Sequence, residues 1–194
     1  MILSESYLWQ QAKLRDISIL SKQRIINENV KLSQRLDMTE KKYDLFLSHS
    51  SLDKTLVLTL VQLFNEASYS IYVDWIEDTE LDRNSVTKET ADILKKRMNA
   101  SLGLAYIATK NSIDSKWCPW ELGYFDGKKN TRCCILPIIE ERAFRGQEYY
   151  GLYPYLEYDK SKAGKNEFWV HEQSTNKYVL LRSWLLGEEP REHQ

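Results

Sequence analysis

The sequence has few glycines and prolines, and its first hundred residues contain neither. Gly103 is the first glycine and Pro119 the first proline of a 194-residue chain. This region therefore has no glycine-rich loop of the kind that cradles phosphate groups. We expect any bound diphosphate to use helix N-termini or a partner subunit instead.

Long apolar runs, a disulfide framework and a strong charge of one sign are also missing. No apolar run approaches the roughly 20 residues that span a bilayer, and the first residues lack the basic segment and apolar core of a signal peptide. The three cysteines are an odd number and two of them are adjacent, which favours a reducing cytoplasm. A net charge of −1 gives no electrostatic basis for binding nucleic acid or an anionic membrane. Cysteines and histidines show no metal-binding spacing, so we expect a cytoplasmic protein with no metal, nucleic-acid or membrane partner.

The composition is that of a globular protein, with 42% hydrophobic and 28% charged residues. Residues 1–41 are polar and rich in helix-forming residues, which predicts an N-terminal helical extension that packs against the domain or mediates self-association. Residues 42–194 form the predicted domain. The boundary rests on the change at residue 43, where a buried strand begins.

Strand and helix patterns alternate after this point. We predict strands at 43–48, 70–74, 102–107 and 133–139, with a possible fifth strand after the aromatic loop 149–155. Helices are predicted after the capping-box-like Ser50-x-x-Asp53, near Thr87, and with Pro119 in the first helical position. Residues 167–170 and 177–180 form either a hairpin or a strand that leads into a last helix. This order predicts an α/β fold with a five-stranded, mostly parallel sheet that has helices on both faces.

Ligands of such sheets bind beyond the carboxyl ends of the strands. Four candidate residues fall on this rim: Ser48, His49, Asp74 and Trp75. Two of them have a plainer reading, since His49 could be a solvent-facing loop residue and Asp74 could bind backbone in a turn. A further candidate, Glu121, lies in the segment Trp117-Cys118-Pro119-Trp120-Glu121, where one carboxylate is framed by indole rings. This arrangement suits a flat, cationic ligand with a glycosidic bond.

Three segments together resemble Toll/interleukin receptor (TIR) domains of the bacterial type. The first is Tyr43-Asp44-Leu45-Phe46-Leu47-Ser48-His49-Ser50, the second is Val73-Asp74 with the polar loop after it, and the third is Asp114 to Leu122 with its Trp-rich approach to Glu121. The resemblance implies a flavodoxin-like fold and cleavage of the nicotinamide–ribose bond of NAD+. The products would be nicotinamide with ADP-ribose, a cyclic ADP-ribose isomer or an ADP-ribosyl conjugate, made as a signal in antiphage defence of the Thoeris type. NAD+ is then a substrate, and no cofactor is expected.

The resemblance also implies roles for single residues. Glu121 matches the catalytic glutamate of the family, and the substrate-contacting positions are matched by Phe46, Ser48, His49, Asp74, Trp75, Trp117 and Trp120. The chemistry agrees, because nicotinamide is a cationic leaving group and one carboxylate can stabilise the oxocarbenium-like ribose that it leaves behind. Glu121 could instead be a capping-turn acid, and Trp117 and Trp120 could be core anchors. We read Cys118 as a structural thiol, and Cys133 and Cys134 as core residues.

Partners and alternatives follow from the same family. Members commonly assemble through TIR surfaces, and a separate effector protein would respond to the product. The loop 77–86, which includes Asp82 and Arg83, contains no glycine or proline, so its contribution to assembly is open. One alternative is a non-catalytic TIR interaction module that signals by assembly. Another is the chemistry of nucleoside 2-deoxyribosyltransferases, which share the fold and a carboxylate.

Overall fold

The structure is a computed structural model and describes residues 2–17, 22–33, 42–78, 87–128, 132–138 and 148–192. Its helices and strands occur in the order α1 (Glu5–Leu14), α2 (Lys22–Ser33), β1 (Tyr43–Ser48), η1 (Ser51–Asp53), α3 (Lys54–Glu66), β2 (Ile71–Tyr72), α4 (Asp74–Glu77), α5 (Lys88–Asn99), β3 (Ser101–Ala108), α6 (Trp117–Asp126), β4 (Cys133–Pro137), η2 (Glu148–Leu152), β5 (Tyr155–Lys160), β6 (Asn166–Glu172), β7 (Lys177–Leu180) and α7 (Leu181–Leu185).

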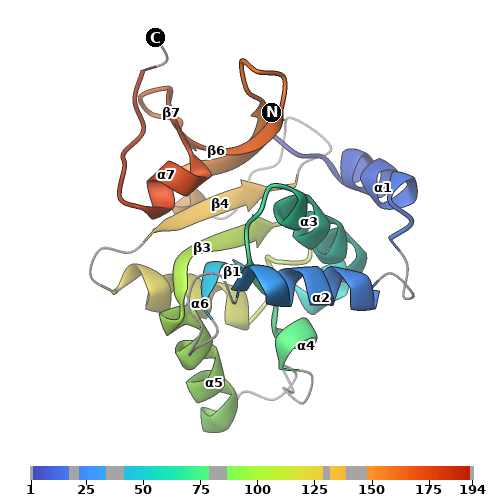
Figure 1. Cartoon of the computed structure of the whole chain (residues 1–194). Helices are drawn as coiled ribbons and strands as arrows, with labels where there is room; N and C mark the ends of the chain where they lie inside the picture. The colour runs from blue at the N-terminus through green and yellow to red at the C-terminus, as the bar shows by residue number, and fades with distance from the viewer. Residues whose placement is uncertain are drawn as a thin grey trace.

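The strands form one sheet in the order β2-β1-β3-β4-β5-β6-β7 (Figure 1). Strands β1 to β5 are parallel, as predicted, and give the flavodoxin-like α/β arrangement. The predicted count of five is wrong, because β6 and β7 add an antiparallel hairpin at the β5 edge. Buried Phe168 and Val170 alternate with partly exposed residues in β6, the pattern of an antiparallel strand with one solvated face. Asn176 closes the hairpin with a φ of 53°, which asparagine tolerates, and β7 then runs directly into α7.

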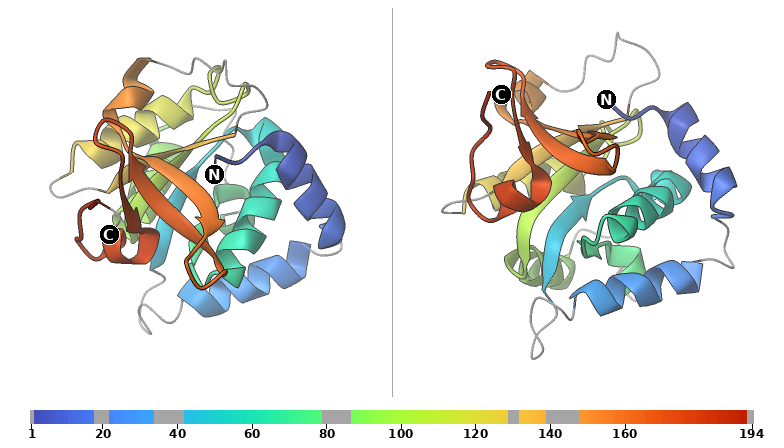
Figure 2. Two further views of the ribbon diagram at one scale, coloured as in Figure 1. Left: turned by 90° about the horizontal axis from the view of Figure 1, so that it is seen from above. Right: turned by 45° about the horizontal axis from the view of Figure 1, so that its top comes forward.

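Helices cover both faces of the parallel part of the sheet (Figure 2). Leu45 and Leu47 of β1 belong to the core on the side of α3. Phe46 lies between them in sequence and belongs to the core on the side of α5 and α6, because side chains alternate between the faces of a strand. Ser48 continues the Phe46 side, which places its hydroxyl at the carboxyl end of β1 next to α6.

The N-terminal helices form a second layer outside α3. Every residue from Leu56 to Phe64 of α3 is buried, so α3 is covered on its outer side as well as by the sheet. Leu8 of α1 and Ile25 of α2 are fully buried in the same core. The helical prediction is therefore confirmed over 5–14 and 22–33, and these helices pack against the domain. The boundary at residue 41 lies outside the described residues and stays a prediction.

None of the described helices is both long enough and apolar enough to cross a membrane.

Candidate active site

A buried hydrogen bond joins the two central candidates. The Ser48 hydroxyl, at the last residue of β1, donates to Oε2 of Glu121 over 2.6 Å, and both side chains are fully buried. The two residues are 73 positions apart in sequence, and the fold brings them together at the carboxyl edge of the sheet. The hydroxyl donor holds the carboxyl group of Glu121 in one orientation before any ligand binds.

Helix α6 starts earlier than the sequence predicts. Trp117 is its first residue, so Pro119 is the third and Glu121 the fifth. The prediction of Pro119 in the first position is wrong because all N–H groups of a first helical turn lack intrahelical acceptors, and proline is tolerated throughout that turn. The Ser115 hydroxyl accepts the N–H of Cys118 over 3.2 Å and satisfies one of these donors. Glu121 thus lies beyond the first turn, where the field of the helix dipole is weaker than within it, and it accepts a hydrogen bond from Ser48.

His49, Asp74 and Trp75 form a second cluster beside the first. Nδ1 of His49 lies 2.7 Å from the Leu47 carbonyl oxygen, an acceptor, so Nδ1 carries the proton. The Trp75 indole N–H donates to Nε2 over 2.9 Å, and an Asp74 carboxylate oxygen lies 3.3 Å from the same nitrogen. The His49 ring is therefore held through both of its nitrogens, by the Leu47 carbonyl on one side and by Trp75 and Asp74 on the other.

The plainer reading of His49 is wrong. His49 and Asp74 are each only 2% exposed, so His49 is not a solvent-facing loop residue. Asp74 is the first residue of the short helix α4, not part of a strand, and its carboxylate lies against His49. Strand β2 stops at Tyr72, earlier than predicted, because Val73 already serves as the N-cap of α4.

The aromatic candidates occupy two settings. Trp117 is almost fully buried and meets Trp120 edge-to-face with ring centroids 5.4 Å apart, while Trp120 stacks on Tyr124 at 5.8 Å. Trp117 precedes Glu121 by four residues and so shares its side of α6. Phe46 is buried and stacks on Tyr72 at 5.0 Å, deep in the core. Contact of these rings with a ligand stays a prediction.

A salt bridge that the sequence analysis missed fixes the far end of the Asp74–Trp75 segment. Arg97 of α5 binds both carboxylate oxygens of Asp78, at 2.8 and 2.6 Å, and the Tyr72 hydroxyl donates to Asp78 over 2.8 Å. The hydrogen bond to Asp78 raises the pKa of Arg97 above its ordinary value, so the guanidinium stays charged. Charge spacing within one helix or strand gives no signal for a pair that is 19 residues apart.

Asp53 has a different role from the one that its capping-box pattern predicts. Ser50 does accept the Leu52 N–H, at 3.4 Å. Asp53, however, is buried and accepts hydrogen bonds from the Thr109 hydroxyl at 2.7 Å and the Asn111 amide at 2.5 Å. It therefore joins the start of α3 to the loop after β3, which leads into α6.

The cysteines are free and buried, as predicted for structural thiols. Burial raises the pKa of Cys133 to about 12 and that of Cys134 well above its ordinary value, so both stay protonated. Within the described ranges, no group of three or more His, Cys, Asp and Glu residues could hold a metal ion.

Two open cavities of about 650 and 700 Å³ lie away from the candidate residues. The first is lined by α5 residues, with Lys42 and Tyr124, and the second by the hairpin residues Trp169 and Tyr178 with the turn before them. Most of the loop 77–86 lies outside the described residues, including Asp82 and Arg83.

Comparison with known proteins gives two relatives. The chain is 46% identical over 149 residues to a "Probable 3' cyclic ADP-D-ribose synthase ThsB'" from Bacillus cereus strain MSX-D12. The aligned region covers 75% of this chain and 76% of that protein. It is 38% identical over 97 residues to a "Putative cyclic ADP-D-ribose synthase TIR2" from Cytobacillus dafuensis, which covers 50% of this chain and 26% of that protein. No protein-family model matches the chain.

Proposed function

The chain belongs to the TIR family of cyclic ADP-ribose synthases, and from this premise we propose how its site cleaves NAD+. The enzyme breaks the bond between nicotinamide and ribose, and the bonding electron pair leaves with nicotinamide, which becomes neutral. Positive charge develops on the ribose, and Glu121 stabilises this oxocarbenium-like state.

The observation that carries the assignment is the buried hydrogen bond between Ser48 and Glu121. Ser48 lies in a parallel strand and Glu121 in a helix, so both are held by packed elements and not by a loop. A carboxylate placed in this way need not reorganise as charge develops on the substrate. In this proposal Trp117, one turn before Glu121 and almost fully buried, excludes water from the same side.

Exclusion of water favours cyclisation. An intramolecular nucleophile of the bound ADP-ribosyl group can then reach the anomeric carbon before water does. The new bond to the anomeric carbon forms as nicotinamide departs, the nucleophile loses its proton, and no water is consumed. The product class is therefore a cyclic ADP-ribose isomer, in keeping with the names of both relatives.

Assembly and signalling complete the proposal. The full burial of Glu121 means that covering groups must move before NAD+ can reach it, and self-association through TIR surfaces is the event that we assign to this opening. The product then acts as a diffusible antiphage signal on a separate effector protein. Measurement of nicotinamide release against protein concentration, beside size-exclusion chromatography, tests the link. Turnover per chain that does not rise with assembly would contradict it.

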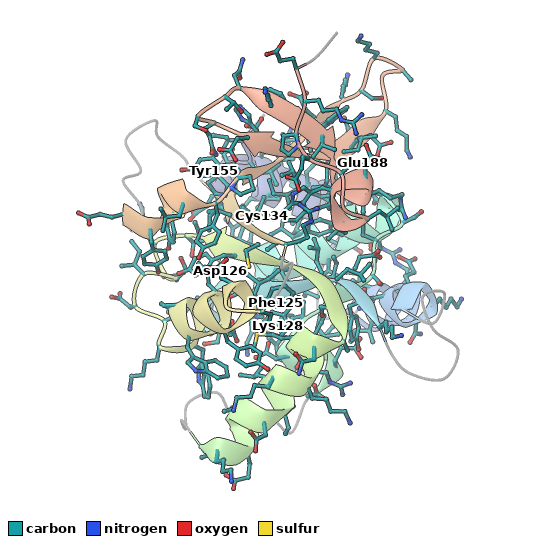
Figure 3. The ribbon with its side chains drawn as sticks, turned by 90° about the vertical axis from the view of Figure 1, so that its left-hand side faces the viewer. Phe125, Asp126, Lys128, Cys134, Tyr155 and Glu188 are labelled. Carbon is teal, nitrogen blue, oxygen red and sulfur yellow. The ribbon has the colours of Figure 1, made fainter. Side chains whose placement is uncertain are left out.

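The assignment of Glu121 is tested by nicotinamide release from NAD+ with Glu121→Gln, which keeps the side-chain shape and removes the charge. Asp126→Asn is the matched control, since Asp126 is an exposed carboxylate near the end of the same helix, close to the labelled Phe125 and Lys128 in Figure 3. We expect the wild type and Asp126→Asn to release nicotinamide and Glu121→Gln to release none. Equal release by all three would remove Glu121 from the mechanism.

A further inference from the structure

We infer that helix α2 positions the part of the site that carries Asp74 and Trp75, an inference that rests on the proposed function. The sequence assigns no such role to the N-terminal helices. Two contacts from α2 reach the segment from Ile71 to Glu77, and Figure 1 shows α2 lying beside α4.

The first contact provides hydrogen bonds to the open edge of β2. β2 is the edge strand of the sheet, and the Leu45 N–H of β1 bonds to the carbonyl of Ser70, so the Ile71 backbone groups face away from β1. Asn29 of α2 meets both groups: its Oδ1 accepts the Ile71 N–H and its Nδ2 donates to the Ile71 carbonyl, each over 2.6 Å. A side-chain amide carries the same donor and acceptor pair as a peptide group, so Asn29 pairs with β2 as a neighbouring strand would.

The second contact reaches the site more directly. The Lys22 ammonium lies 5.0 Å from the centroid of the Trp75 ring, within the range of a cation–π interaction. The N–H of that indole donates to His49. The position of the Trp75 ring is therefore set by α2 on one side and by His49 on the other.

The Asn29 contact is buried and specific. Asn29 is 1% exposed, and Nδ2 also lies 3.3 Å from Oε1 of Glu77 at the end of α4. One side chain thus joins the start and the end of the segment that holds Asp74 and Trp75. Because β2 has only two residues and one neighbouring strand, it has few other hydrogen bonds to fix it.

The helix α1 provides a structural comparison. Arg15, just after α1, binds both carboxylate oxygens of Glu66 at 2.8 Å, a contact that fastens the N-terminal region to α3 and touches neither β2 nor α4. If the N-terminal helices only stabilise the fold, Arg15→Ala and Asn29→Ala should lower activity in proportion to their loss of thermal stability. If α2 positions the site, only the Asn29 and Lys22 variants should lower activity.

The test uses full-length protein and measures kcat and KM for NAD+, thermal stability, and hydrogen–deuterium exchange over residues 71–77. Variants are Asn29→Ala and Lys22→Met, with Arg15→Ala and Lys31→Ala as controls, Lys31 being an exposed residue of α2. We expect kcat/KM to fall about tenfold or more in Asn29→Ala and several-fold in Lys22→Met, since small misplacements of a catalytic constellation cost up to about a hundredfold. Both controls should keep the wild-type kcat/KM.

A substitution that restores the hydrogen bonds tests the geometry independently. A protonated aspartic acid has one donor and one acceptor, as the asparagine amide does, whereas its carboxylate has acceptors only. Activity of Asn29→Asp relative to the wild type should therefore recover as the pH is lowered toward the pKa of the introduced acid. The same relative activity at all pH values would contradict the pairing with Ile71.

Failure of the inference is distinguishable from failure of the proposed function. A wild type that leaves NAD+ intact refutes the proposed function. In that case hydrogen–deuterium exchange over residues 71–77 is the measurement that still tests the role of α2. Faster exchange over residues 71–77 in Asn29→Ala, but not in Arg15→Ala, supports the inference. Unchanged exchange in Asn29→Ala, or equal losses of kcat/KM in Asn29→Ala and Arg15→Ala, overturns it.

Discussion

Replacement of Ser48 by alanine removes the donor that lies 2.6 Å from the Glu121 carboxylate. Both groups are fully buried, so water does not readily replace the lost hydroxyl. A hydrogen bond to a charged group contributes about 1.5–3 kcal/mol. If the bond places the carboxylate against the developing charge, the whole of this energy is lost from the transition state. At about 1.36 kcal/mol per tenfold change in rate, kcat should fall roughly 10- to 150-fold.

The assay is steady-state release of nicotinamide from NAD+ by the wild type, Ser48→Ala and Ser48→Cys, with a thermal melt of each. Ser48→Cys keeps a side chain of similar shape and a weak S–H donor, so we expect an intermediate kcat. A fall in kcat at nearly constant KM agrees with orientation of Glu121 by Ser48. A rise in KM alone would instead support direct contact between Ser48 and substrate. Wild-type kcat and KM in folded Ser48→Ala would refute both roles.

Three further predictions concern stability. Gly103→Ala in β3 places a Cβ 2.7 Å from Cδ2 of Leu185, and we expect overpacking to lower the free energy of unfolding by about 1–3 kcal/mol. In Gly123→Ala of α6 the new Cβ meets nothing within 4 Å, and we expect helix propensity to raise the free energy of unfolding by up to about 1 kcal/mol. Urea unfolding measures both, and a stabilised Gly103→Ala would contradict the close packing of β3 against α7. The hydrogen bond from Arg15 lowers the pKa of Glu66 below its ordinary 4.5, so its contribution to stability is present above that value and is lost as the pH falls through the lowered pKa. Thermal melts between pH 7 and pH 3 should show this acid-dependent loss in the wild type and a smaller loss in Arg15→Ala, and equal losses would exclude the ion pair as the cause.

The parallel core of the fold follows from local sequence patterns. Buried strands of mixed aliphatic and aromatic residues alternate with helices, and this order alone predicts β1 to β4, a possible β5, and the helices α3, α5 and α6. Residues 167–180 suit either a hairpin or a strand that leads into a helix, and only the partner strand β5 decides for the hairpin. The outer layer has a local signal too: residues 56–64 are apolar except for Thr59 and Gln62, and apolar residues around the whole circumference indicate a helix that is covered on two sides.

In the candidate site, too, local sequence predicts where the residues lie, whereas distant contacts decide how they pair. Ser48, His49, Asp74 and Trp75 lie at the carboxyl edge of the sheet, where strand order and the position rule for ligands predict them. The pairings within the site depend on contacts between distant segments, which single-sequence patterns do not specify. The hydrogen bond from Asn29 to Ile71 spans 42 positions, and no periodicity or motif connects the two residues.

Nor does local sequence fix the start of α6. A proline usually marks the first position of a helix, but any residue of the first turn can lack its N–H. Ser115 and the packing of Trp117 decide the start here, two residues before Pro119. The shift moves Glu121 to the fifth position, beyond the first turn, where it accepts the hydrogen bond from Ser48.

The most direct test of the account is mass-resolved chromatography of NAD+ after incubation with concentrated wild-type protein, beside Glu121→Gln. The account predicts that the wild type alone converts NAD+ to free nicotinamide and a product one water lighter than ADP-ribose. NAD+ that stays intact with the wild type at every protein concentration, or that is consumed equally by Glu121→Gln, would contradict it.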